Sequence, residues 1–156
     1  MVKKNYQIEI PNEKKIAKAV AKNAHASLKY STELVRELKG QRLDRSMEFL
    51  QRIMEKKEHL PLRRYKKKVP HRKGETKSFT KTGRYPVKTA GIFSSLLESV
   101  KSNADYKGLD AENLLITHMF VSQGFGRIGY QPQGRISGKA RRKKAVHLEV
   151  VVTEAK

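Results

Sequence analysis

Two strongly basic segments limit how much of this 156-residue chain can fold into a core. Residues 63–84 contain ten Lys and Arg and one acidic residue, and residues 124–144 contain seven Lys and Arg and no acidic residue. They carry +16 of the formal net charge of +20, so the other 113 residues are almost balanced. A merely solvated surface would intersperse acidic residues. The sequence therefore predicts a nearly neutral body with two cationic extensions whose natural partner is a polyanion.

The rest of the composition is typical of one small domain without cofactor chemistry. The length suits a single core, so we expect residues 1–156 to form one domain. The chain has no cysteine, and its five histidines lack metal-ligand spacing. No catalytic constellation is apparent, and no apolar stretch approaches the roughly 20 residues that span a bilayer. We therefore expect a soluble intracellular protein with no cofactor, no metal, no membrane segment and no enzymatic activity.

Three segments have the pattern of β-strands. Apolar and polar residues alternate over 6–10 and, most clearly, over 145–153, while residues 114–123 have β-type composition. The last two segments are separated by one loop, so they are most simply antiparallel neighbours. We expect the segment at 6–10 to complete a small three-stranded antiparallel sheet.

Four segments are expected to form helices that cover the apolar face of this sheet. Residues 13–22 are rich in alanine, the strongest helix former. Ser31 and Asp44 are suitable N-caps for two further helices. Pro86 suits the first turn of the longest helix, in which apolar residues recur every three or four positions as far as Ala104. The sequence thus predicts an α+β fold with three or four helices.

The stretch Gly-Phe-Gly-Arg-Ile-Gly at 124–129 matches the dinucleotide-binding pattern G-x-G-x-x-G. In that fold the last glycine opens a helix whose N-terminus binds the pyrophosphate. Here Pro132, Gly134 and Gly138 follow and break helical continuity, so we reject a dinucleotide site. Glycine allows close backbone approach and arginine suits phosphate, so the region favours a long hairpin loop that lies against nucleic acid. A solvated loop without a partner is the alternative.

Several motifs together resemble the large-subunit ribosomal protein twenty-two family in its archaeal and eukaryotic form. They are Gly-Arg-Tyr-Pro-Val-Lys-Thr-Ala at 83–90, Asn-Ala-Asp at 103–105, the glycine-rich hairpin at 124–140 and the closing strand Val-His-Leu-Glu-Val-Val-Val-Thr-Glu at 146–154. The segment 63–84 is similar to the insertion that distinguishes this branch from the bacterial form. The chain ends soon after the last strand, which makes it similar to archaeal members.

The resemblance implies a structural constituent of the large ribosomal subunit in the cytoplasm. Its implied partners are large-subunit ribosomal RNA, neighbouring ribosomal proteins and the nascent polypeptide. It also implies that residues 114–153 form an extended β-hairpin, whose tip near 127–139 lines the polypeptide exit tunnel. Carried over by position, the expected tunnel-lining residues are Arg127, Tyr130, Gln131, Pro132, Arg135 and Lys139.

The cations of the two basic segments are the expected contacts to RNA phosphates. Neutralising phosphates releases counterions, so binding of this kind weakens steeply with salt. The expected RNA-binding residues are Arg63, Arg64, Lys66, Lys67, Lys68, Arg72, Lys73, Lys77, Lys81, Arg84, Arg127, Arg135, Lys139, Arg141, Arg142, Lys143 and Lys144.

Two other classes of function remain open from the residues alone. A free-standing nucleic-acid-binding protein or RNA chaperone would use the same cationic segments away from the ribosome. An enzyme that acts on RNA is supported only by the charge.

Overall fold

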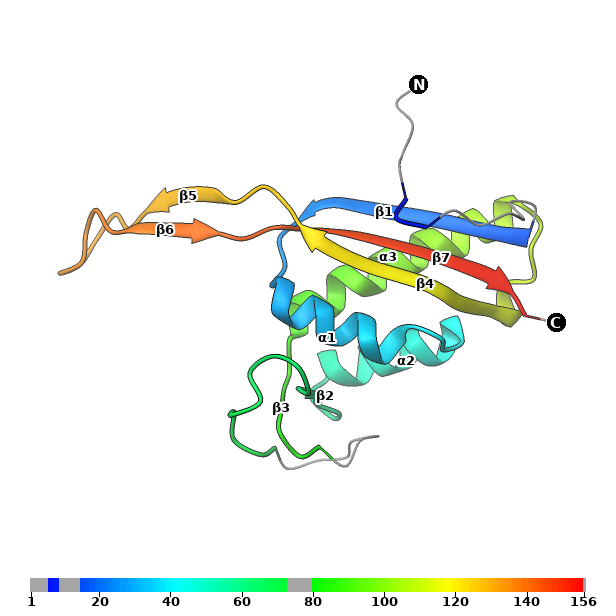
Figure 1. The fold of residues 1–156 in the computed structure, drawn as a ribbon, viewed down its shortest axis with the longest axis horizontal. Helices are drawn as coiled ribbons and strands as arrows, with labels where there is room; N and C mark the ends of the chain where they lie inside the picture. Colours follow the sequence, from blue (N-terminus) through cyan, green and yellow to red (C-terminus); the bar gives the residue numbers. More distant parts are fainter. Residues whose placement is uncertain (1–5, 9–14, 73–79, 156) are drawn as a thin grey trace, which may run out of the picture.

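The computed structural model describes residues 6–8, 15–72 and 80–155. Its centre is a three-stranded antiparallel sheet in the order β1-β7-β4 (Figure 1). The strands of this sheet are β1 (Ile16–Ala24), β4 (Leu114–Gln123) and β7 (Val146–Glu154). The α-helices of the described residues are α1 (Leu28–Leu38), α2 (Leu43–Met54) and α3 (Val87–Tyr106). The predicted α+β fold is confirmed.

Smaller elements connect and extend these layers. The chain between α2 and α3 contains a short antiparallel pair, and the chain between β4 and β7 contains a second pair that projects from the body. A 3-10 helix precedes β4. These elements are β2 (Leu60–Pro61) with β3 (Gly83–Arg84), β5 (Arg127–Tyr130) with β6 (Ala140–Lys143), and η2 (Ala111–Asn113).

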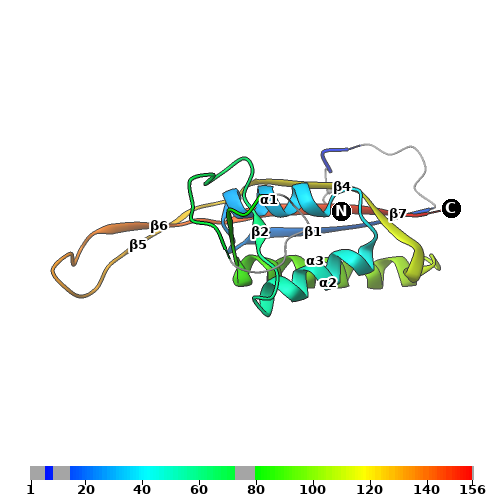
Figure 2. The same ribbon diagram turned by 90° about the horizontal axis from the view of Figure 1, so that it is seen from below.

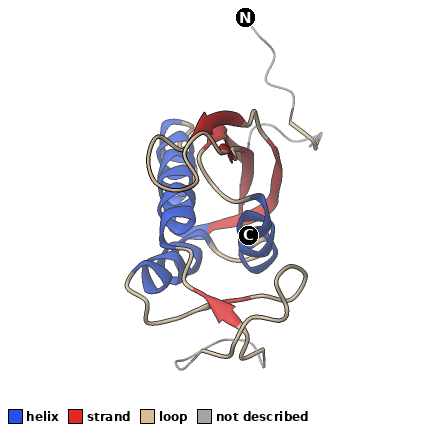
Figure 3. Cartoon of the chain, turned by 90° about the vertical axis from the view of Figure 1, so that its left-hand side faces the viewer, coloured by secondary structure: helices blue, strands red, loops and turns tan. Residues whose placement is uncertain are grey.

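One hydrophobic core lies between the sheet and the helices. Helix α3 packs against β1, β7 and α2, and α1 packs along β4 (Figure 2). Seen from the end that carries β5 and β6, the helices and the curved sheet surround this core (Figure 3). The β7 residues predicted to share one face are all buried, and Phe93 and Leu97 of α3 are buried with them. The apolar face predicted from the alternation of residues in β7 therefore faces the core.

The alanine-rich segment predicted as a helix at 13–22 is a strand in its described part. Residues 16–24 form β1 and pair antiparallel with β7, with Ala17 opposite Val152 and Ala19 opposite Val150. The alanine side chains face the core and let α3 pack closely. Helix propensity is a weak preference that tertiary pairing overrides. Here the segment forms a strand because it pairs with the edge of β7 that β4 leaves unpaired.

The strand predicted at 6–10 is also wrong where the structure describes it. Residues 6–8 are not in a strand, and residues 9 and 10 lie outside the described residues. The third position in the sheet belongs to β1. The prediction of a three-stranded antiparallel sheet holds, but with a different third strand.

The helix starts differ from their predicted caps by a few residues. Helix α1 begins after Ser27 and not after Ser31, which is buried inside the helix. Helix α2 begins after Arg42 and not after Asp44. The side chains of Ser27 and Arg42 make no capping hydrogen bond. Packing of the apolar faces therefore sets these starts more than capping does.

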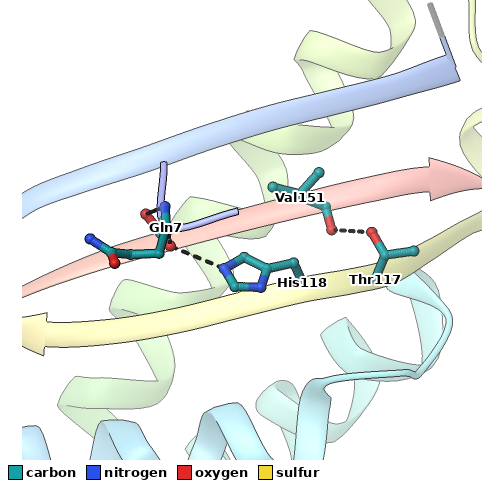
Figure 4. Close-up of polar contacts among 5 residues, drawn as sticks. Gln7, Thr117, His118 and Val151 are labelled. Atoms are coloured by element: carbon teal, nitrogen blue, oxygen red, sulfur yellow. Dashed lines mark hydrogen bonds and ion pairs between the residues drawn. The ribbon is translucent and has the colours of Figure 1, made fainter. Parts of the chain in front are cut away.

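The sheet face opposite α3 carries a buried hydrogen bond between a histidine and a carboxylate (Figure 4). His118 Nε2 lies 3.0 Å from Glu149 Oε1, and the backbone N–H of Gln7 donates to both oxygens of that carboxylate at 3.1 and 3.3 Å. A β-bulge at Thr117, whose hydroxyl donates to the Val151 carbonyl at 3.2 Å, moves His118 to this face. His118 is 9% exposed, so its side chain is buried although it lies on the outer face of the sheet.

The carboxylate of Glu149 also influences Tyr6. Burial of the ring raises the pKa of Tyr6, and the negative charge of Glu149 raises that pKa further. The ammonium of Lys18 lies 5.6 Å from the centroid of the Tyr6 ring. Residues 6–8 are therefore attached to the outer face of the sheet through Glu149 of β7 and Lys18 of β1.

Candidate nucleic-acid interface

Residues 125–144, which we call the arm, continue the hairpin of β4 and β7 away from the body (Figure 1). In the arm, β5 and β6 pair antiparallel, and seven of their eight residues are exposed. These strands have no core of their own in the structure, since the buried core residues belong to the body. Their side chains are therefore available to a partner.

The two faces of the arm differ chemically. Directly opposed residues of an antiparallel pair share a face. One face combines Arg127 and Lys143 with the pair Gly129 and Arg141, so it is cationic. The other face consists of two pairs, Ile128 with Arg142 and Tyr130 with Ala140. Since Ile128 is 67% exposed and Tyr130 71% exposed, this second face offers apolar and aromatic surface beside a single cation.

A nine-residue turn, 131–139, closes the arm. The N–H of Gln131 donates to the Lys139 carbonyl at 3.1 Å, and the N–H of Gly138 donates to the Gln131 carbonyl at 2.9 Å. Gly134 and Gly138 have φ of 88° and 77°, which glycine adopts without steric cost. Of the predicted tunnel-lining residues, four lie in this turn, whereas Arg127 and Tyr130 lie in β5. The four are Gln131, Pro132, Arg135 and Lys139.

The joint between body and arm explains the first glycine of the motif. The N–H of Gly124 donates to the Ala145 carbonyl at 2.9 Å, and Asn23 Oδ1 accepts the N–H of Phe125 at 3.0 Å. A Cβ atom at position 124 would lie 2.9 Å from Asn23 Oδ1 and 3.1 Å from the carbonyl carbon of Ala145. The protein's own packing therefore favours glycine here, independently of any RNA.

The first basic segment is a long loop closed by backbone pairing. The N–H of Leu62 donates to the Thr82 carbonyl at 3.1 Å, and the N–H of Arg72 donates to the Lys81 carbonyl at 2.9 Å. Lys73 and Lys77, which are also predicted RNA contacts, lie outside the described residues. Arg84 is half-buried in β3. The exposed cations of this loop are Arg63, Arg64, Lys66, Lys67, Lys68, Arg72 and Lys81.

A buried carboxylate in α1 holds the start of this loop. Glu33, which is 1% exposed, accepts the backbone N–H groups of Arg63, Arg64 and Tyr65 at 3.3, 2.7 and 2.6 Å. Three N–H donors on one buried carboxylate hold the backbone of residues 63–65 against α1. Sequence reasoning missed this role of Glu33, because an acidic residue near the start of a helix is expected to interact with the helix dipole.

The described residues contain neither a metal-binding cluster nor a membrane span. Within 6–8, 15–72 and 80–155, no group of three or more His, Cys, Asp or Glu side chains could hold a metal ion. In the same part of the chain, no helix is long and apolar enough to cross a membrane. The Nδ1 atom of His147 accepts the backbone N–H of Asn23 at 3.2 Å, whereas His118 is hydrogen-bonded to Glu149.

Comparison with known proteins places this chain in a family. The family model for ribosomal protein L22p/L17e matches residues 19–153, which include both basic segments and all three strands of the central sheet except the start of β1 and the last residue of β7. The chain belongs to this family of ribosomal proteins.

Three relatives show how much of the chain is shared. The chain is 36% identical over 155 residues to large ribosomal subunit protein uL22 of Methanococcus aeolicus, with 99% of each chain covered. It is 38% identical over 151 residues to the uL22 of Hyperthermus butylicus, with 96% of each covered. It is 39% identical over 146 residues to the uL22 of Ignicoccus hospitalis, with 92% of this chain and 91% of the relative covered. The resemblance to the archaeal form of the family is confirmed.

Proposed function

We propose that this protein is a structural constituent of the large ribosomal subunit, in the cytoplasm, and that it binds large-subunit ribosomal RNA. One observation carries the proposal: a strand pair rich in Lys and Arg projects from the body with its side chains exposed. Family membership supports the same partner, and the relatives are named as large ribosomal subunit proteins. The protein has a scaffolding role and no catalytic role.

The arm and the loop 63–84 are the proposed RNA contacts. The cationic face of the arm is suited to phosphates, and Arg presents a planar fork of donors to them. The opposite face presents Ile128 and Tyr130, and an exposed tyrosine ring can stack on an unpaired base. Because a folded RNA presents both phosphates and unpaired bases, it matches both faces of the arm.

The turn 131–139 is the proposed contact with the nascent polypeptide. It lies at the far end of the arm, so it is the part of the protein that reaches furthest from the body (Figure 1). Its cations are Arg135 and Lys139, and its remaining side chains are small or neutral. We propose that this turn forms part of the wall of the exit tunnel while the body contacts neighbouring ribosomal proteins.

Removal of the whole arm tests RNA binding. Because the Gly124 N–H bonds to the Ala145 carbonyl, residues 125–144 can be replaced by Asn-Gly, the preferred two-residue hairpin turn. We expect the shortened protein to keep the midpoint of urea unfolding while losing most of its comigration with large subunits on a sucrose gradient. If full-length protein sediments mostly away from the large subunit, it is a free-standing nucleic-acid-binding protein and the proposal is wrong.

Removal of the turn alone separates RNA binding from the tunnel contact. Tyr130 and Ala140 are the last pair of the arm, so Asn-Gly in place of 131–139 gives a regular hairpin. We expect this variant to join the large subunit normally and to lose photo-cross-links to a stalled nascent chain. Cross-links that persist at full yield would contradict the placement of the turn in the tunnel wall.

A further inference from the structure

The two basic segments meet at a cleft of about 430 Å³. Its walls come from the start of α1, from the loop that follows β2, and from the base of the arm, which lie near one another in Figures 1 and 2. The cleft volume is within the range of small-ligand sites. The lining residues that carry the argument are Lys29, Lys66, Gly124, Gly126, Arg142 and Lys144.

Among the described residues, the lining of the cleft contains four cations and no carboxylate. Lys29 comes from α1, Lys66 from the loop, Arg142 from β6, and Lys144 from the residues that directly follow β6. Like charges brought together from three parts of a fold repel one another unless an anion joins them. The first turn of α1 also faces this region, and its uncapped N–H groups add to the positive potential.

The position of Lys66 is fixed by contacts to α1. Glu33 anchors the three residues before it, and Lys66 itself has a φ of 57°, which is uncommon for a residue with a side chain. Its Nζ lies 3.0 Å from the hydroxyl oxygen of Tyr30 and 4.3 Å from the centroid of that ring. Glu33 is therefore a positioning residue for the Lys66 ammonium.

The position of Arg142 depends on a glycine. A Cβ atom at position 126 would lie 2.7 Å from Arg142 Nε, so Gly126 leaves the space in which the guanidinium lies. Arg142 and its neighbour Arg141 point to opposite faces of the arm, and only Arg142 lines the cleft. The chain thus offers a matched pair of arginines, one in the cleft and one outside it.

We propose that this cleft binds the phosphodiester backbone of one RNA strand, so that the loop and the arm hold the same nucleotides. The inference rests on the proposed function, in which the protein binds ribosomal RNA. Four cations and no carboxylate among the described lining residues suit a chain of phosphates better than a neutral ligand. The two basic segments then act as one composite site and not as two independent contacts.

A double-mutant cycle tests whether the segments share their ligand. Lys66→Gln, Arg142→Gln and the double variant are titrated with a full-length transcript of archaeal large-subunit ribosomal RNA. Each single change weakens binding and lowers the slope of log affinity against log salt by about one. Because both cations bind the same phosphates, we expect the double variant to lose affinity by at least about threefold less than the product of the single losses.

The control pair is Lys67→Gln and Arg141→Gln, since both side chains are exposed, cationic and absent from the cleft lining. We expect their losses to multiply, within about 1.5-fold. If the affinity losses of Lys66→Gln and Arg142→Gln also multiply while wild-type protein binds the transcript, the shared site is wrong and the proposed function stands. If wild-type protein does not bind the transcript, both fail.

Site-specific cross-linking gives an independent readout on the assembled subunit. A photoreactive amino acid at position 66 and one at position 144 should cross-link to nucleotides within about two positions of each other along one strand. Cross-links from the control positions 67 and 141 should not reach neighbouring nucleotides of one strand. Cross-links from positions 66 and 144 to an acidic protein segment, or to RNA strands far apart, would overturn the inference.

Discussion

The two ends of one β-hairpin have the same backbone pairing and opposite surroundings. In the body, β4 and β7 pair antiparallel and direct Ile116, Val150 and Val152 into the core, where each is fully buried. Beyond the joint, β5 and β6 pair in the same way but leave Ile128 and Tyr130 largely exposed. The difference between the body and the arm therefore lies in what covers the strands.

This difference indicates where the stability of each part originates. An isolated two-stranded ribbon is marginally stable in water, because it buries too little apolar surface to offset its loss of conformational entropy. The arm adds seven Lys and Arg within residues 124–144 and no acidic residue, so self-repulsion weakens it further. We infer that contacts with RNA supply the stability that the body obtains from its core.

The largest effect should come from a cavity in the body. Phe93 is fully buried between α3 and the sheet, so Phe93→Ala should lower the free energy of unfolding by about 3–5 kcal/mol. Tyr130→Ala removes an aromatic ring from the arm and should change the same quantity by less than about 0.5 kcal/mol. Urea unfolding of the free protein measures both. Equal losses would show that the arm is part of the core.

A smaller effect should come from the carboxylate that attaches the basic loop to the body. Glu33→Gln replaces a buried acceptor of three N–H groups with an amide, and should lower the free energy of unfolding by about 2 kcal/mol. Glu48→Gln is the control, because its carboxylate is 67% exposed and forms a surface ion pair with Arg52. Unfolding of Glu33→Gln at the wild-type midpoint would mean that the loop is not held by this contact.

The smallest effect should come from the joint itself. Gly124→Ala places a methyl group against Asn23 and the backbone of Ala145, and should lower the free energy of unfolding by about 1 kcal/mol. Gly129→Ala lies within the arm, where the added carbon would be 3.6 Å from Lys143 Cε, an ordinary contact. Thermal unfolding should therefore leave Gly129→Ala unchanged. If Gly129→Ala lost more stability than Gly124→Ala, the strain would lie in the arm and not at the joint.

Strong periodicity made most of the body predictable. The helix that became α3 and the strand that became β7 follow from apolar residues at spacings of three to four and of two. The segment of β1 was misassigned because alanine favours a helix locally, whereas its strand partner comes from the other end of the chain. Local preference does not report such distant pairing.

The interface was predictable in composition but not in geometry. The charge of residues 63–84 and 124–144 identified both basic segments without any structure. The role of Glu33 and the convergence of Lys66 with Arg142 depend on contacts between residues far apart in the sequence. No single-sequence pattern records those contacts, so the cleft emerges only from the folded arrangement.

Hydrogen exchange of the backbone amides tests the contrast between body and arm most directly. In free protein, amides of β4 and β7 should exchange through global unfolding, while those of β5 and β6 should exchange within about tenfold of their unprotected rates. On the large-subunit RNA transcript, the amides of β5 and β6 should slow by about a hundredfold or more. If β5 and β6 are already protected as strongly as β4 and β7 in the free protein, the arm is stable without RNA and the account is contradicted.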